Sequence, residues 1–257
     1  MLSTAELVVL AVVGLLAGAV NAVAGGGSLL TFPAMVAAGL PPLTANISNT
    51  IAQLPGYASV VAGYREELAG QGGRLRRLAI PTLIGATGGV VLLERSSPEA
   101  FEAVVPWLVL AASGLLAVQP SVSRAVRGRT RGVDPDGAGG GRGAWTWLGT
   151  LACGAYGAYF GAAVGVVLLA VLAIGIADRL QRLNALNRTL VLLANLLAAP
   201  LLALVGPVDW SAVAVVAPAT LAGGYAGARV ARRLPDRVLR AGVVTLGVAI
   251  GLWLLVR

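Results

Sequence analysis

Several residue types on which enzymes and metal sites depend are missing from this sequence. Its 257 residues include no histidine, one cysteine (Cys153) and, because all 19 basic residues are arginine, no lysine. These absences exclude Ser-His-Asp and Cys-His nucleophiles, Schiff-base lysines, zinc fingers and P-loop lysines. We therefore expect neither catalytic activity nor a cofactor or metal ion, and an intramembrane enzyme is the disfavoured alternative.

Charged residues are also scarce, and this scarcity decides the class of protein. They make up 12% of the chain, whereas a typical soluble domain carries about 25%. Residues 7–64 form a run of 58 without any charge, and one membrane-spanning helix needs only about 20 apolar residues. The composition predicts an all-α, polytopic membrane protein embedded in a lipid bilayer. The net charge of +8 then indicates membrane topology rather than a nucleic-acid partner.

The spacing of the uncharged runs predicts two helical hairpins and six single passes. No positive charge precedes the first run, so we expect it to be mature structure and not a signal peptide. A first repeat (1–123) and a second (144–257) flank a polar cytoplasmic linker, 124–143, with five arginines and two aspartates. The predicted segments are the hairpin 5–40, the passes 44–64, 78–93 and 103–122, the hairpin 144–177, and the passes 189–208, 210–228 and 241–256.

The arginines cluster in four connections, and this distribution predicts the orientation. If these connections are cytoplasmic, 17 of the 19 arginines lie inside and only Arg95 and Arg257 lie outside, as the positive-inside rule requires. The three passes of the first half then run inward, outward and inward, and those of the second half run outward, inward and outward. Both termini are predicted outside the plasma membrane, and the two halves have opposite orientations.

An internal repeat accompanies this predicted duplication. Residues 18, 25 and 39 are glycines, and each is matched by a glycine 136 residues later. The Asn-x-x-Asn pair at 46–49 and the glycines at 85 and 89 recur 138 residues later. Inverted repeats with broken helices are typical of secondary transporters, which bind their substrate near the membrane midplane where the repeats meet.

The glycine-rich elements of both halves resemble those of a known family. Residues 18–33 (GAVNAVAGGGSLLTFP), 39–46 (GLPPLTAN) and 223–235 (GGYAGARVARRLP) are similar to elements of the sulfite exporter TauE/SafE family, and the resemblance extends over roughly residues 8–255. It implies a membrane permease for sulfite, sulfonates or other small sulfur-containing or organic anions. We therefore expect a small anion as the substrate, and the sequence leaves the oligomeric state open.

The break at Gly25, Gly26 and Gly27 is the most informative candidate site. Glycine permits an unwound backbone, which inside a bilayer is tolerated only against protein or a water-filled cavity. The helix that begins near Ser28 directs its amides and its positive dipole end into the break, and such an end attracts anions. The hydroxyls of Ser28 and Thr31 add donors. The alternative is a tight turn that binds nothing.

The second break, around Gly157, Gly161 and Gly165, has only Tyr156 and Tyr159 as polar neighbours in the sequence. We therefore expect an asymmetric site to which the first half contributes more than the second.

Amide side chains form another candidate group. Asn46, Asn49 and Gln53 share one helical face because they are three and four residues apart, and Asn184 and Asn187 are their counterparts in the second half. Buried amides in a membrane protein usually face the bundle interior. They could bind an anion or hold helices together, and both interpretations stay open.

Arg188 is the one arginine expected inside a helix. A planar guanidinium binds an oxyanion through two parallel hydrogen bonds, but a long side chain can also snorkel to the cytoplasmic surface, which is the interpretation that we favour. The candidate substrate-binding set, which also includes an asparagine of the glycine-rich element, is Asn21, Gly25, Gly26, Gly27, Ser28, Thr31, Asn46, Asn49, Gln53, Asn184, Asn187 and Arg188.

Acidic residues are absent from the middle of every predicted pass. Proton-coupled carriers usually keep an ionisable relay in the membrane, so we expect transport driven by the membrane potential or by a proton carried on the substrate. The sequence thus predicts an alternating-access anion permease of the plasma membrane. An anion channel and a non-transporting scaffold or partner subunit remain the alternatives.

Overall fold

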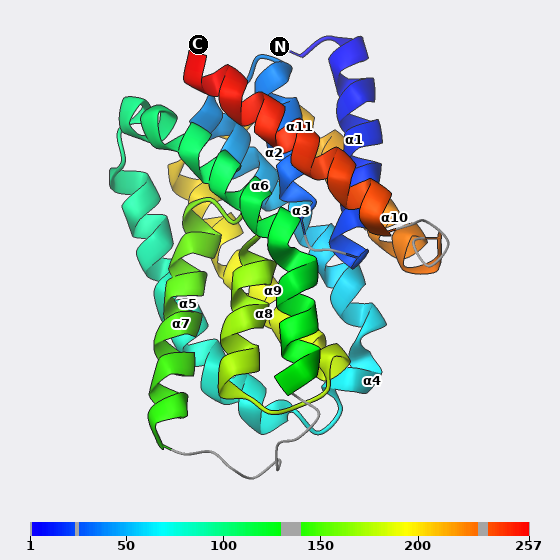
Figure 1. Ribbon diagram of the computed structural model, residues 1–257. Coiled ribbons are helices and arrows are strands. Elements are labelled where there is room, and N and C mark those ends of the chain that lie inside the picture. Colours follow the sequence, from blue (N-terminus) through cyan, green and yellow to red (C-terminus); the bar gives the residue numbers. More distant parts are fainter. Residues whose placement is uncertain (1, 24–25, 130–139, 231–235, 257) are drawn as a thin grey trace.

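The chain folds into a bundle of helices. The computed structural model describes residues 2–23, 26–129, 140–230 and 236–256, which form eleven helices and no strand and so confirm the all-α prediction (Figure 1). In chain order the helices are α1 (Thr4–Val23), α2 (Ser28–Ala37), α3 (Pro42–Gly63), α4 (Arg65–Leu68), α5 (Gly72–Arg95), α6 (Pro98–Arg129), α7 (Gly140–Tyr159), α8 (Val164–Gly175), α9 (Leu180–Val205), α10 (Trp210–Val230) and α11 (Asp236–Val256).

The surface of the bundle is apolar and its interior contains many polar side chains. Helices α1, α5, α6 and α9 are long and apolar enough to cross a membrane by length and composition. All five tryptophans are exposed, while amide and hydroxyl side chains of α3 and α9 are buried. This distribution is the one expected when lipid surrounds a protein and the polar groups must find partners inside it.

The two helical hairpins open toward opposite ends of the bundle (Figure 1). Both chain termini lie at one end, here called the terminal end, and α4 lies at the other, here called the linker end (Figure 1). Helices α1 and α2 extend from the terminal end to the middle and back, whereas α7 and α8 do the same from the linker end (Figure 1). An inverted repeat predicts this arrangement, and the repeat itself stays a prediction.

Four glycines allow two pairs of helices to approach backbone to backbone. Helix α1 packs against α10, and α7 packs against α5. A Cβ atom at any of the four positions would come within 3.0 Å of a carbonyl oxygen on the partner helix. The glycine–carbonyl pairs are Gly18 with Thr220, Gly154 with Thr82, Gly85 with Leu151, and Gly223 with Leu15. These contacts are equivalent in the two halves. Gly154 follows Gly18 by 136 residues and Thr220 follows Thr82 by 138, and the other two pairs are related by the same offsets.

Several helices extend beyond the predicted passes. Helix α9 begins at Leu180 rather than at Thr189, so the polar residues ahead of the predicted pass are helical. Helix α6 continues to Arg129, and α7 begins at Gly140, so both ends of the predicted polar linker are helical. Hydrophobicity marks the membrane-crossing part of a helix, but helical hydrogen bonds extend beyond it wherever no proline or cap ends them.

We expect Gly85→Ala to destabilise the protein by about 1–3 kcal/mol, the usual range for overpacking a tight core. The added methyl group would overlap the Leu151 carbonyl of α7. Gly88 lies on the same helix, and a methyl group added there would have nothing within 4 Å, so Gly88→Ala should leave stability unchanged or raise it by about 0.5–1 kcal/mol. Thermal unfolding of both variants in detergent measures this difference, and equal midpoints would contradict the close helix contact.

Candidate functional site

The two hairpins each change direction in a short segment beside a polar helix. Helix α1 ends at Val23 and α2 begins at Ser28, while α7 ends at Tyr159 and α8 begins at Val164. In the second break, Gly161 and Ala163 both have left-handed backbone angles, with φ of 76° and 56°. Helix α3 packs against α2 and α9 packs against α8, and α3 and α9 also contact each other. The breaks therefore lie against the two helices that carry the buried amides.

The first break is held by an amide pair. The Asn21 side chain accepts a hydrogen bond from the Gly27 N–H at 2.8 Å and donates one to the Gln53 Oε1 at 2.9 Å. Gln53 in turn donates to the Thr31 hydroxyl at 2.7 Å, and that hydroxyl lies against the Asn49 Oδ1. All four side chains are buried. They connect α1, α2 and α3 in one continuous hydrogen-bond network.

This network uses hydrogen-bonding groups, among them the Gly27 N–H and the Thr31 hydroxyl, that the sequence analysis proposed as ligands of an anion. In the described conformation the Gly27 amide bonds Asn21, and the predicted role of these residues as substrate ligands stays a prediction. A Cβ atom at Gly27 would come within 3.0 Å of the Ala17 carbonyl, whereas one at Gly26 would meet only the flexible Leu116 side chain at 3.0 Å. Of these two glycines, Gly27 is thus the one that requires glycine more strictly. The predicted site residue Gly25 lies outside the described residues.

Ser28 at the first break contacts Tyr57, which lies near a residue of the second half of the protein. The Ser28 hydroxyl lies 3.1 Å from the Tyr57 hydroxyl on α3, and Tyr57 and Tyr64 lie near Arg188 of α9. Tyr57 is absent from the site predicted from the sequence, although it follows Gln53 by four residues and continues the face of Asn46, Asn49 and Gln53. Helical spacing alone could have identified it.

Arg188 is buried, with 8% of its surface exposed. Its Nε has no hydrogen-bond partner among the described residues, and the ion pairs that Asp178 forms with two other arginines at the linker end do not include it. The expectation that this side chain snorkels to the surface is therefore wrong. Helix α9 begins earlier than predicted, and this extension places Arg188 inside the bundle instead of at a helix end.

Two asparagines bind the backbone on either side of the second break. Asn46 of α3 donates from Nδ2 to the Tyr159 carbonyl at 2.9 Å, and Asn187 of α9 donates from Nδ2 to the Gly165 carbonyl at 2.8 Å. A Cβ atom at Gly165 would lie 3.3 Å from the Arg188 Nη1. Tyr156 and Tyr159 are the polar neighbours of this break in the sequence, and the structure adds polar side chains from helices that are distant in the sequence.

Asn184 does not join either group. It is half-buried, and its side chain makes no hydrogen bond to a residue within the described part of the chain. The other predicted side chains divide into the first break, with its network and Ser28, and a group of Asn46, Asn187 and Arg188 around the second break. Polar side chains from both halves therefore meet where α3 and α9 cross.

The fold and the polar breaks define the class: a polytopic helical membrane transporter. The sequence profile of the sulfite exporter TauE/SafE family matches residues 10–254, so the chain belongs to this family of membrane transporters. The family resemblance drawn from the glycine-rich elements is thereby confirmed.

Curated relatives are similar over most of the chain. A "probable membrane transporter protein YfcA" of Escherichia coli (strain K12) is 26% identical over 239 residues, which cover 91% of this chain and 82% of the relative. A "probable membrane transporter protein" of Haemophilus influenzae is 23% identical over 243 residues, which cover 93% and 91%. No solved structure matches the chain. These names support membrane transport and specify no substrate.

We expect Gln53→Leu to destabilise the protein by about 1–3 kcal/mol, the usual cost of leaving a buried polar group without its partner. The substitution removes hydrogen bonds to both Asn21 and Thr31. Gln181 is exposed on α9, so Gln181→Leu is the matched control and should change stability by less than about 0.5 kcal/mol. Thermal unfolding in detergent compares them. An unchanged midpoint for Gln53→Leu would contradict the network.

Proposed function

We propose that this protein is an alternating-access permease that carries a small anion across the plasma membrane, with sulfite or an organosulfonate as the leading substrate class. The observation that carries the proposal is the buried guanidinium of Arg188, whose Nε has no protein partner among the described residues. A buried charge without compensation is costly. An anionic substrate at this position would compensate it, and membrane-embedded ionisable residues commonly mark substrate pathways.

The matched glycine contacts support an inverted repeat. Two helix pairs, α1 with α10 and α7 with α5, use glycine–carbonyl contacts at equivalent positions of the two halves. Transporters built from such repeats bind substrate at the repeat interface near the midplane, which in this chain corresponds to the α3–α9 crossing. The proposed site and the proposed symmetry therefore refer to the same place.

The arginine distribution supports a cytoplasmic linker end and external termini. Helix α4 and the beginning of α5 lie at the linker end (Figure 1), and they carry Arg65, Arg74, Arg76 and Arg77. Because Arg188 is buried, 16 arginines rather than 17 remain in the connections assigned to the cytoplasm. The bias still satisfies the positive-inside rule.

Contacts at the linker end are the proposed inner gate. The Asp178 carboxylate, between α8 and α9, forms ion pairs with Arg74 of α5 and with Arg182 of α9, the latter at 3.1 Å. The buried Gln71 side chain also donates to the Arg182 carbonyl at 3.0 Å. These bonds tie the α5 and α9 ends together. Alternating access requires them to break when the inner side opens.

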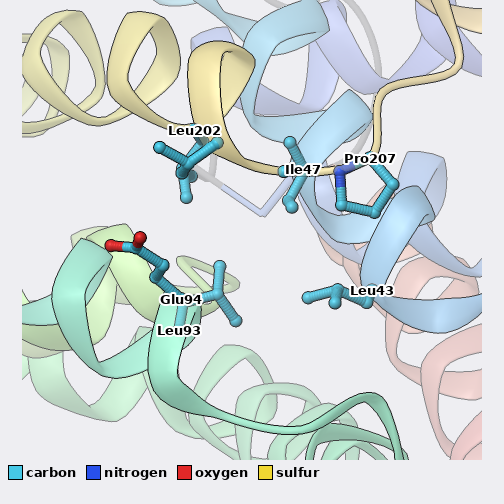
Figure 2. A pocket seen from close by; sticks show the side chains of 8 residues that line it. Leu43, Ile47, Leu93, Glu94, Leu202 and Pro207 are labelled. Atoms are coloured by element: carbon cyan, nitrogen blue, oxygen red, sulfur yellow. The ribbon is translucent and has the colours of Figure 1, made fainter.

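A small cavity at the opposite end marks the proposed outer side. It has a volume of about 70 Å³ and lies where α3 begins and where α5 and α9 end. Figure 2 shows Leu43, Ile47, Leu93 and Leu202 around it, with the exposed Glu94 at its edge. In the described conformation the linker end is thus bonded across, and the terminal end contains this small cavity.

We expect Arg188→Met to reduce anion flux at least about 10-fold while leaving stability unchanged or raised. Replacing a buried, uncompensated charge by an apolar side chain of similar length is often neutral or stabilising. If the guanidinium only held helices together, its removal would instead lower the stability of the protein. The measurement combines uptake of a panel of labelled small anions into proteoliposomes with thermal unfolding. Saturation and counterflow in the same vesicles separate a carrier from a channel.

Arg65→Met is the matched control for this experiment, because Arg65 is exposed on α4. It should retain the flux of the unsubstituted protein. Absence of flux for every anion tested in the unsubstituted protein would contradict the proposed function and favour a scaffold or partner subunit. Undiminished flux in Arg188→Met would remove Arg188 from the site.

The Asp178 cluster gives a separate prediction about the inner gate. Partial burial acts to raise the pKa of this carboxyl, but hydrogen bonds from the Arg179 N–H and from the Arg74 and Arg182 side chains outweigh it, so the pKa lies below its ordinary value. The ionised form therefore stabilises the fold above the ordinary carboxyl pKa of about 4. This stabilisation is lost as the pH falls through the lowered pKa.

We accordingly expect Asp178→Asn at neutral pH to lower the thermal unfolding midpoint by about 2–4 °C, which corresponds to a loss of about 1 kcal/mol. Acidification from about pH 4 down through the lowered pKa of Asp178 should progressively remove the difference between the two proteins. Glu66→Gln is the control, since Glu66 is exposed on α4. Identical midpoints for Asp178→Asn and the unsubstituted protein at neutral pH would mean that the Asp178 ion pairs do not stabilise the closed linker end.

A further inference from the structure

The second break leaves unused hydrogen-bond acceptors beside a cation. Asn46 and Asn187 donate from Nδ2 to backbone carbonyls at the two edges of the break. Because a carbonyl oxygen only accepts, these bonds fix which atom of each amide is the nitrogen. Each Oδ1 is then left buried and without a hydrogen-bond partner among the described residues.

The Asn187 oxygen and the Arg188 guanidinium lie together at the beginning of α8, and the Asn46 amide lies at the other edge of the break, on the Tyr159 carbonyl. A Cβ atom at Gly165 would lie 3.3 Å from the Arg188 Nη1 and 3.9 Å from the Asn187 Oδ1, so both side chains pack closely against the beginning of α8. The Arg188 Nε is likewise buried without a partner within the described residues. Asn46, Asn187 and Arg188 are all more than nine-tenths buried. The region thus combines a cationic donor with neutral acceptors.

The chemistry of these atoms restricts the ligand. A guanidinium favours an oxyanion, but an oxyanion without hydrogen would direct its oxygens at the amide oxygens, which can only accept. Buried acceptors that stay without a donor are costly. A ligand that joins an anionic group to a hydroxyl or ammonium group would satisfy the guanidinium and an amide oxygen together.

We propose that the anion bound at the α7–α8 break carries its own hydrogen-bond donor, and that the Oδ1 atoms of Asn187 and Asn46 select for this donor. This inference rests on the proposed function, since it refines the class of anion that Arg188 binds. It also assigns the two asparagines a role in specificity, whereas Arg188 supplies the attraction for charge. Hydroxy- and amino-substituted sulfonates, and oxyanions that keep one proton, belong to the selected class.

A matched pair of probes tests the proposal in the unsubstituted protein. Ethanesulfonate and 2-hydroxyethanesulfonate have the same charge and differ by one hydroxyl group. Each probe competes with a labelled transported anion for uptake into proteoliposomes. We expect 2-hydroxyethanesulfonate to bind with at least about 10-fold higher affinity than ethanesulfonate, because a site built to hydrogen-bond a hydroxyl rejects the analogue that lacks it. Equal affinities would overturn the inference while leaving the proposed anion transport in place. Failure of both probes to compete with an anion that the protein transports would also overturn the inference, whereas absence of flux for every anion of the panel would overturn the proposed function as well.

Variants at the two asparagines locate the selectivity. In Asn187→Leu the preference of about 10-fold should fall toward equality, with the affinity for ethanesulfonate kept or increased, and Asn46→Leu provides a second test on the other side of the break. A preference that persists in both variants would overturn the assignment. Sodium ions could also raise the affinity for ethanesulfonate to that for 2-hydroxyethanesulfonate. This result would overturn the assignment as well, because a cation would then be the partner of the amide oxygens.

Discussion

Helices that break inside a bilayer impose the constraint on which the rest of this structure depends. At a break the backbone amides and carbonyls lose their helical partners, and lipid supplies none. This chain supplies them from side chains of neighbouring helices. Asn21 accepts from the Gly27 N–H at the first break, and Asn46 donates to the Tyr159 carbonyl at the end of α7. The polar faces of α3 and α9 exist because the hairpins beside them break, and the same faces are then available to a substrate.

Close approach of helix backbones accompanies this constraint. Between lipid-facing helices there is no hydrophobic gain from association, so packing depends on contact. The glycine–carbonyl contacts of α1 with α10 and of α5 with α7 bring each half of the chain against the other. An interface built from flat glycine surfaces fixes the helices at short range. It also leaves few side chains whose rearrangement would be needed if the two halves moved relative to each other.

The two breaks resemble each other in geometry and differ in chemistry. At the first, the amides and the Thr31 hydroxyl satisfy one another, so the network is complete without a ligand. At the second, Asn46 and Asn187 each keep an oxygen without a partner among the described residues, beside the buried Arg188. A duplicated scaffold thus supports a structural role in one half and, in our proposal, a binding role in the other. This is the reverse of the asymmetry expected from the sequence.

The sequence by itself determined the class of protein and the apolar helical segments, because charge scarcity and apolar run length are local properties that lipid selects directly. It also placed both breaks, since three consecutive glycines and the repeat offset are visible along the chain. It failed for Arg188 and for the polar surroundings of Gly165. Whether a side chain near a predicted helix end reaches the surface depends on where the helix begins and on what packs against it. Only the tertiary structure decided this, by extending α9 to Leu180 and bringing Asn187, Arg188 and the beginning of α8 together.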